Sequence, residues 1–434
     1  MRKSASESTE MVMRKKILFV VEALTFAHVA RSAVLAQILQ AANYEVHFAC
    51  YPDAYLERVK AELNGCRHWP LKSRVEYGNY IASMNACHSP YNVGMLESFI
   101  REELDLFDQV KPDIVIGDLR YSLSISCLQA RIRYVNLISA VWSPFVKQQL
   151  TFPEGFLPWQ LGIGTRDLFF RILHSFAFRN ICRPFNILRS RFGLPEFKDI
   201  FDLHCAGDIN LYLDPPELFE VRDLPGSDKF IGPVLFSIDT PVPPELEGPQ
   251  PLPIVFVSLG SSGPIDCLPV VLRTLTQLPV LSVVATSGRM DVNIQHPSLI
   301  IREFLPARSI LQRSSLVISN GGSPMSYLAL SEGVPIIAVC SNMDQHLISQ
   351  SITKYGAGMS LRSENLDERT VKDAVNRCFG QPMYRDSAQR CSKFISAEKT
   401  ARNFRDAIND IISSGDEEKV RYHGLQAVGD RHDY

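Results

Sequence analysis

Residues 318–345 constrain the fold more than any other part of the chain. An apolar run ends at Ser319 and is followed by Asn320-Gly321-Gly322 and a helix-compatible stretch. A second apolar run then leads into a polar segment, residues 342–345. The order strand, glycine turn, helix, strand, polar loop is typical of an α/β fold. Such a fold places an anion at the helix N-terminus, where free N–H groups and the helix dipole favour negative charge.

The glycines of this turn allow a bound phosphate to approach the backbone closely. The polar loop after the next strand lies on the same edge of a parallel sheet, so Asp344 and Gln345 are expected to reach whatever the phosphate carries. A carboxylate accepts hydrogen bonds and an amide both donates and accepts, which suits sugar hydroxyls. The segment therefore predicts a site for a phosphate-linked sugar.

The same segment resembles the nucleotide-sugar motif of the UDP-glycosyltransferase-like superfamily, whose usual form is HGG…GVP…P…DQ. The resemblance extends over nearly the whole chain. It implies the GT-B fold, an α/β architecture of two Rossmann-like, doubly wound parallel-sheet domains that face each other across a cleft. It also implies a sugar-transfer enzyme that binds a nucleoside-diphosphate sugar in its second domain.

The motif departs from the family pattern at several positions. Asn320 replaces the usual His, and Pro324, Met325 and Leu328 replace Gly, a hydroxyl residue and Glu. The phosphate-binding hydroxyl and the ribose-binding carboxylate are thereby lost. Donor binding by main-chain N–H groups of Gly321, Gly322 and Ser323 remains one interpretation. A turn-forming Asn before two glycines is the other.

Length and composition limit the class of protein. The 434 residues suffice for two domains, and a net charge of −2 favours neither nucleic acid nor a generally anionic surface as partner. Ten scattered cysteines without a C-x-x-C spacing indicate buried thiols in a reducing compartment. The first apolar run, residues 17–21, is too short for a signal peptide or membrane span. We therefore expect a cytoplasmic protein.

Alternating strands and helices organise the chain into segments. Residues 15–236 predict the first Rossmann-like domain, which in the family binds the acceptor, with a helical aromatic-rich region at 142–201. A proline-rich linker is predicted at 237–253 and a nucleotide-sugar-binding domain at 254–396. Helix is expected over 383–409, and the family's last helix, here 397–415, crosses back to the first domain. We expect the tails, residues 1–14 and 416–434, to be disordered.

Two residues of the first domain are candidates for acid–base chemistry. His28 lies in an expected loop, residues 22–30, at the carboxyl edge of the sheet, where an imidazole can take a proton from an acceptor hydroxyl. Asp118 follows a predicted strand at the same edge and can orient the ring. The alternatives are a capping or surface His and a helix-capping Asp. The resemblance favours catalysis, since the family's H-x-x-P histidine is the base.

Further donor contacts are expected in the second domain. Gly260, Ser261 and Ser262 form a turn that resembles the family's VSLGS motif and can bond a phosphate, or serve as a plain Gly-Ser turn. Phe304 and Leu305 resemble the segment that lies along the nucleotide base.

The aromatic and arginine-rich stretch before residue 201 has three interpretations. It is an acceptor pocket, with Trp142, Phe145 and Trp159 as candidates; a face suited to weak contact with a membrane; or a set of amphipathic helices packed on the core. The paired acids of a metal-dependent transferase are not evident, so no metal and no cofactor besides the nucleotide sugar is expected.

The sequence thus predicts an inverting, metal-independent glycosyltransferase. It would move a sugar from a UDP- or dTDP-sugar to a hydroxyl of a small or apolar acceptor, with His28 as general base. Two alternatives stay open. The altered motif also suits a non-catalytic accessory protein that activates a partner transferase. The fold also serves other reactions, such as nucleotide-sugar epimerisation.

Overall fold

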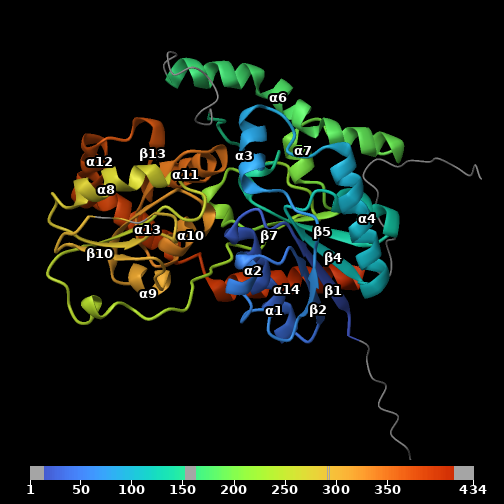
Figure 1. Ribbon diagram of the computed structural model, residues 1–434, viewed down its shortest axis with the longest axis horizontal. Coiled ribbons are helices and arrows are strands. Elements are labelled where there is room, and N and C mark those ends of the chain that lie inside the picture. Colours follow the sequence, from blue (N-terminus) through green and yellow to red (C-terminus); the bar gives the residue numbers. More distant parts are fainter. Residues whose placement is uncertain (1–13, 152–162, 291, 293, 415–434) are drawn as a thin grey trace, which may run out of the picture.

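The structure is a computed structural model that describes residues 14–151, 163–290, 292 and 294–414 (Figure 1). Two α/β units lie side by side, each with a parallel sheet covered by helices. The order of strands is β3-β2-β1-β4-β5-β6-β7 in the first sheet and β10-β9-β8-β11-β12-β13 in the second. These are the two Rossmann-like domains of a GT-B fold.

The central strands of the first domain are short and almost wholly buried. All five residues of β4 are buried, as expected for a parallel strand with both faces covered. The strands are β1 Lys16–Val21, β2 Glu45–Cys50, β3 Arg67–Pro70, β4 Ile114–Asp118, β5 Arg133–Ile138, β6 Ile209–Tyr212 and β7 Lys229–Phe230. The helices are α1 Phe26–Ala41, α2 Ala54–Arg58, α3 Tyr77–Asn85, α4 Val93–Val110, α5 Leu123–Ala130, α6 Ile163–Arg191 and α7 Ile200–His204, with 3-10 turns η1 Ala140–Trp142 and η2 Pro216–Leu218.

The second domain repeats the arrangement with six strands. They are β8 Ile254–Ser258, β9 Leu281–Ala285, β10 Leu299–Arg302, β11 Ser314–Ser319, β12 Ile336–Cys340 and β13 Gly358–Arg362. The helices are α8 Leu268–Leu275, α9 Ala307–Leu311, α10 Ser323–Ser331, α11 Met343–Tyr355, α12 Glu368–Gly380, α13 Pro382–Ser392 and α14 Ala397–Ser413, with 3-10 turns η3 Pro244–Leu246, η4 Ile265–Cys267 and η5 Ser363–Asn365. The stretch around η3 packs on this domain, because Leu246 is buried in the same core cluster as Ile254 and Phe256.

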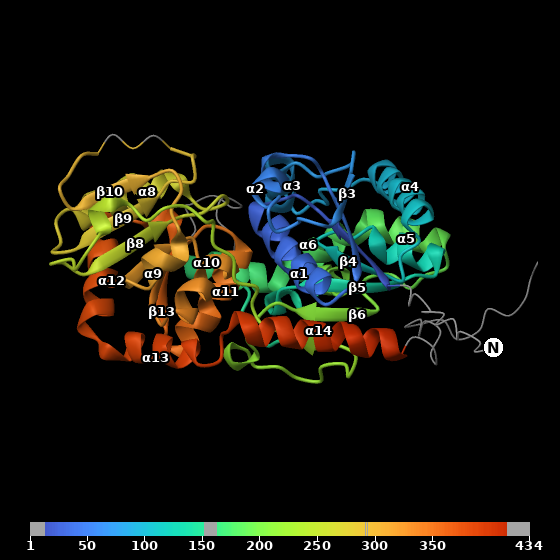
Figure 2. The ribbon, with the colours of Figure 1, turned by 90° about the horizontal axis from the view of Figure 1, so that it is seen from below.

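The last helix crosses from the second domain to the first. Figure 2 shows α14 running beneath the first domain, where Phe404, Ile408 and Ile411 join the core of β1 and α1. The expected continuous helix over 383–409 is wrong, because α13 ends at Ser392 and α14 starts at Ala397. Ser396 caps the new helix by accepting from the Lys399 N–H at 3.4 Å, so the chain changes direction here.

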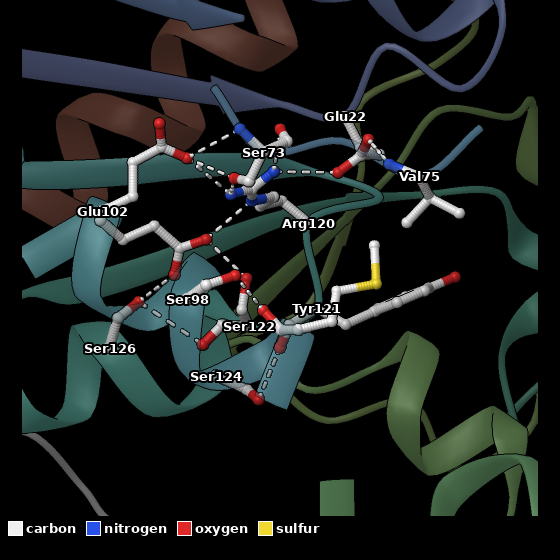
Figure 3. Close-up of polar contacts among 12 residues, drawn as sticks. Glu22, Ser73, Val75, Ser98, Glu102, Arg120, Tyr121, Ser122, Ser124 and Ser126 are labelled. Atoms are coloured by element: carbon white, nitrogen blue, oxygen red, sulfur yellow. Dashed lines mark hydrogen bonds and ion pairs between the residues drawn. The ribbon is translucent and has the colours of Figure 1, made fainter. Parts of the chain in front are cut away.

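A buried charge network ties the loops at the carboxyl edge of the first sheet to α4 (Figure 3). Arg120, just after β4, donates from Nε to Glu103 of α4 at 2.7 Å and from Nη1 to Glu22, just after β1, at 3.0 Å. Burial raises the pKa of Glu22 and Arg120 opposes that rise. Separating these groups would leave a buried charge unpaired, which is strongly unfavourable. The network therefore holds these loops in one arrangement.

Candidate active site

A cavity of about 660 Å³ lies between the carboxyl edges of the two sheets and is lined by both domains. It contains most of the residues selected from the sequence. Those that line it are His28, Trp142, Gly260, Ser261, Ser262, Phe304, Leu305, Asn320, Gly322, Ser323, Asp344 and Gln345. Asp118 and Gly321 lie behind this wall, and Phe145 is partly buried away from it. Trp159 is outside the described residues.

His28 lies in the first turn of α1. The loop expected over residues 22–30 is therefore shorter in the structure and ends before Phe26. Thr25, with extended backbone angles (φ −139°, ψ 160°), is the N-cap, and the helix begins at Phe26. The segment after Thr25 holds neither Gly nor Pro, so nothing in it delays the helix. The short helical turn aims the imidazole from α1 toward the end of the neighbouring strand β4.

His28 and Asp118, 90 residues apart in the chain, are in direct contact. The Nδ1 of His28 is 2.9 Å from Oδ1 of Asp118. The contact exists because β1 and β4 are adjacent strands in which Val21 pairs with Asp118, so α1 starts directly beside the end of β4. The Asp118 carboxylate is fully buried. With Nδ1–H donating to Asp118, Nε2 keeps its lone pair, and it has no hydrogen-bond partner among the described residues.

Arg31 and Ser32 complete the surroundings of Asp118, although neither was predicted from the sequence. Arg31 donates from Nε to Oδ2 at 2.6 Å and from Nη2 to Oδ1 at 2.5 Å, while Ser32 Oγ donates to Oδ2 at 3.0 Å. Burial by itself would raise the pKa of Asp118, but Arg31 and then His28 outweigh it and hold the pKa well below its ordinary value. The carboxylate is therefore ionised across the neutral range.

Arg31 also contacts the histidine. Its Nη2 lies 3.0 Å from Nδ1 of His28, the atom that faces Asp118. Arg31 stands three residues after His28, where the H-x-x-P pattern has proline. One feature of the sequence could have pointed to Arg31: it is a cation about one helical turn after the proposed base, His28.

On the opposite wall, α10 presents its N-terminus to the cavity. The turn before it needs glycine at 321, where φ is +77° and an added Cβ would lie 2.8 Å from Cys340 Sγ. Asn320 Oδ1 accepts from the Gly322 N–H at 3.2 Å, so this side chain does build the turn. Asn320 also lines the cavity. Met325 and Leu328 line the cavity without filling it.

An arginine missed in the sequence supports the Gly-Ser turn after β8. Arg289 donates from Nη1 to the carbonyls of Gly260 at 3.1 Å and Gly263 at 2.8 Å, and it also lines the cavity. Arg58 of α2 lies over the Phe304 ring at 4.2 Å, a cation–π contact between the two domains. Three arginines, Arg31, Arg58 and Arg289, therefore lie at a cavity that also contains a helix N-terminus.

Asp344 and Gln345 belong to the first turn of α11, so the predicted polar loop is shorter than expected. Asn342 is the N-cap and accepts from the Gln345 N–H at 3.0 Å. Asp344 Oδ1 accepts from Trp142 Nε1 of the first domain at 2.9 Å. Gln345 is almost fully buried, and its Oε1 accepts from the Ser341 N–H at 2.9 Å. Asp344 therefore presents the more accessible group to a ligand.

An aromatic wall surrounds the His28 end of the cavity. Trp142 stacks on His204 with ring centroids 4.6 Å apart, and Tyr121 Oη lies 3.0 Å from His204 Nδ1. Burial, followed by the proximity of His28, lowers the pKa of His204 to about 3, so this ring is neutral. The apolar cavity wall continues through Met84 of α3 and Phe178 of α6. Among the residues that the structure describes, no group of three or more His, Cys, Asp or Glu has the arrangement of a metal site.

Two Rossmann-like domains, with a His–Asp contact on one side of the interdomain cavity and a helix N-terminus on the other, have the architecture of GT-B glycosyltransferases. Comparison with known proteins agrees. The family described as "Erythromycin biosynthesis protein CIII-like, C-terminal domain" matches residues 271–407. The chain is 36% identical over 384 residues to a PGL/p-HBAD biosynthesis glycosyltransferase of Mycobacterium tuberculosis, covering 88% of each.

A PGL/p-HBAD biosynthesis rhamnosyltransferase of Mycobacterium bovis is 35% identical over 390 residues, covering 89% of this chain and 85% of the relative. Among solved structures, the spinosyn rhamnosyltransferase SpnG complexed with thymidine diphosphate has a TM-score of 0.65 at 18% identity. The match covers 92% of this chain and 100% of that one. The chain belongs to the UDP-glycosyltransferase-like superfamily and is a glycosyltransferase.

Proposed function

We propose that the chain transfers a sugar, with inversion and without a metal ion, from a UDP- or dTDP-sugar to a hydroxyl of a small or apolar acceptor. The observation that carries the proposal is the His28–Asp118 pair, 2.9 Å apart, on the wall opposite the N-terminus of α10. The thymidine diphosphate bound by SpnG supports a pyrimidine nucleotide in the second domain. The apolar wall near Trp142 and Phe178 supports an apolar acceptor in the first.

The donor diphosphate is proposed to lie at the N-terminus of α10. The N–H groups of Ser323 and Met325 belong to its first turn, and Pro324 has none to offer. Arg289, at the Gly260 turn, supplies a positive charge at the same cavity. Together these groups stabilise the charge that develops on the leaving diphosphate. Asp344, aligned by Trp142, receives the sugar hydroxyls.

In the proposed reaction the acceptor oxygen forms a bond to the anomeric carbon while the bond from that carbon to the diphosphate oxygen breaks. The acceptor proton passes to Nε2 of His28, and the bonding electron pair leaves with the diphosphate. Asp118 keeps the ring oriented and stabilises the imidazolium. Attack from the face opposite the leaving group inverts the anomeric centre.

The experiment measures donor binding and transfer separately. UDP, dTDP and a panel of their sugars are titrated by calorimetry, and transfer is then measured for His28→Ala. General-base catalysis contributes about 10²–10⁴-fold, so we expect a rate loss of that order with nucleotide affinity unchanged. His68→Ala, an exposed histidine on β3, is the matched control and should behave as wild type.

Undiminished transfer by His28→Ala would refute the base assignment. Absence of binding by any nucleotide would instead favour the accessory-protein alternative. Donor turnover in the absence of acceptor, with an isomerised sugar as product, would favour an epimerase.

A further inference from the structure

Helix α6 carries an outward stripe of apolar and cationic side chains. The stripe consists of Leu168, Phe176, Arg179, Arg183 and Ile187, all exposed and separated by eight, three, four and four residues. This spacing places them along one side of a helix. Phe176 is 78% exposed and Leu168 59% exposed, the highest values among the exposed large hydrophobic residues described. Figure 1 shows α6 along the upper edge of the molecule, with one side away from both sheets.

The charge of α6 differs sharply from that of the chain. The helix contains six arginines and one aspartate, a net charge of +5, in a chain whose net charge is −2. The aspartate is not on the stripe, because Asp167 faces Arg362 of the second domain at 3.9 Å. Arg179 and Arg183 make no ion pair with any residue that the structure describes. Their charges are therefore available to an anionic partner.

The opposite side of the same helix lines the cavity. Phe170, Ala177, Phe178 and Ile181 are buried there, beside Trp142 and Met84 at the end of the cavity that contains His28. One helix thus separates the outward stripe from the proposed acceptor site. No helix in the described part of the chain is long and apolar enough to cross a bilayer.

We propose that the outward stripe of α6 docks the protein on an anionic lipid surface, with α6 parallel to the membrane plane. Apolar side chains interleaved with arginines suit the boundary between headgroups and acyl chains, where the apolar groups enter and the guanidinium groups meet lipid phosphates. The apolar side chains and the arginines of the outward stripe supply two separate contributions to binding, and both are needed for stable association.

Docking in this orientation brings the acceptor end of the cavity next to the lipid. A membrane-borne acceptor would then reach His28 past the inner face of α6. This last step rests on the proposed function, whereas the docking itself does not, so the test uses binding and not activity.

The full chain is sedimented with vesicles of phosphatidylcholine alone and of phosphatidylcholine mixed with phosphatidylglycerol. We expect binding to the mixed vesicles that weakens as salt is raised, and little binding to phosphatidylcholine. Arg179→Glu combined with Arg183→Glu should weaken binding at least roughly 25-fold, about fivefold for each arginine. Phe176→Ser should weaken it by about tenfold.

Phe379→Ser is the matched control, because Phe379 is exposed on α12 of the second domain, and its binding should equal wild type. Circular dichroism of each variant establishes that it is folded. Failure of the wild type to bind mixed vesicles, or equal binding by the double arginine variant, would overturn the proposal. So would a concentration-dependent dimer abolished by Phe176→Ser without vesicle binding, since the stripe would then bind a second copy. If the wild-type chain binds the mixed vesicles but transfers no sugar, the proposed function fails and the docking proposal stands.

Discussion

Arg31 forms a bidentate ion pair with Asp118, in which Nε donates to Oδ2 at 2.6 Å and Nη2 donates to Oδ1 at 2.5 Å. The same guanidinium lies 3.0 Å from the imidazole that Asp118 orients. The charge of the carboxylate is thus shared between an arginine and a histidine. A simple His–Asp pair would direct that charge to the imidazole alone.

Removing this arginine is expected to shift the pH dependence of stability. Arg31 is the main group that holds the pKa of Asp118 below its ordinary value against the effect of burial. In Arg31→Met the pKa of Asp118 should therefore rise, so the stabilisation from its ionised form should be lost at a higher pH as the solution is acidified. Arg31→Lys keeps the positive charge without the bidentate contact, so its profile should lie nearer that of wild type. Urea unfolding between pH 3 and 7 measures the three profiles, and an unchanged profile in Arg31→Met would contradict this role.

Replacing Asp118 should affect stability and activity together. Asp118→Asn leaves Arg31 buried without its counter-ion, and breaking such a pair costs about 3–5 kcal/mol of unfolding free energy. Because the folded-state pKa of Asp118 lies below its ordinary value of 3.8, this stabilisation is complete at neutral pH and is lost as the pH falls below that value. Urea unfolding at pH 7 measures the loss, and transfer should fall with it.

The control for this change is Asp113→Asn, just before the other end of β4. Asp113 is partly exposed and pairs with the exposed Lys15 at 3.1 Å. Surface pairs of this kind contribute about 0–1 kcal/mol. Equal losses of unfolding free energy for the two variants would show that the buried contacts of Asp118 stabilise the fold no more than a surface ion pair does.

Two adjacent glycines of the donor turn should respond differently to alanine. At Gly321 the positive φ of 77° costs an L-residue roughly 1–2 kcal/mol, and the new Cβ would also meet Cys340 Sγ at 2.8 Å. At Gly322, where φ is −68°, the nearest atom is Asn320 Oδ1 at 3.4 Å. Calorimetric titration with nucleotide should therefore show weaker binding for Gly321→Ala and near-normal binding for Gly322→Ala. The reverse order would show that the turn is not formed as described.

A buried tyrosine–carboxylate contact between the domains should make stability depend on pH. Tyr327 of α10 donates to Asp214, just after β6, at 2.5 Å. Burial raises the pKa of Asp214 to about 6, although its hydrogen bonds oppose this. Since the folded state holds the proton more tightly than the unfolded state, the unfolding free energy should decline by up to about 3 kcal/mol as the pH rises from about 3 to about 7, through the folded-state pKa.

Tyr327→Phe removes a hydrogen bond that lowers the Asp214 pKa. The variant should lose about 1.5–3 kcal/mol at pH 8, and less at pH 5, as measured by urea unfolding. Tyr44→Phe, which removes a partly exposed bond to Asn409 of α14, should give a smaller loss that is the same at both pH values. A pH-independent loss for Tyr327→Phe would contradict the role of Asp214.

Much of the fold could be predicted because parallel strands with both faces buried leave a strong apolar pattern. β1, β2, β4 and β8 were all recognisable as short apolar runs that end in polar loops. Boundaries set by capping were harder: Thr25 and Asn342 start α1 and α11 earlier than expected, and Ser396 divides the last helical segment. Caps depend on a few local hydrogen bonds, which periodicity does not record.

The candidate site was predicted only in part. His28, Asp118, the Asn320 turn and Asp344 could be selected because each follows a strand at one edge of a sheet. Arg31, His204 and Arg289 were missed because their importance comes from neighbours that are remote in the chain, such as Asp118, Trp142 and Gly260.

The amino-acid order by itself determined the secondary-structure alternation, the two parallel sheets and the edge at which each polar turn emerges, since these follow from local periodicity and glycine placement. Only the tertiary structure decided that Arg31 would share Asp118 with His28, that Trp142 would bond Asp344 across the cavity, and that one side of α6 would face outward. These relations depend on which strands become neighbours and how the domains pack. Such contacts join residues up to 202 positions apart, a distance over which no local pattern carries information.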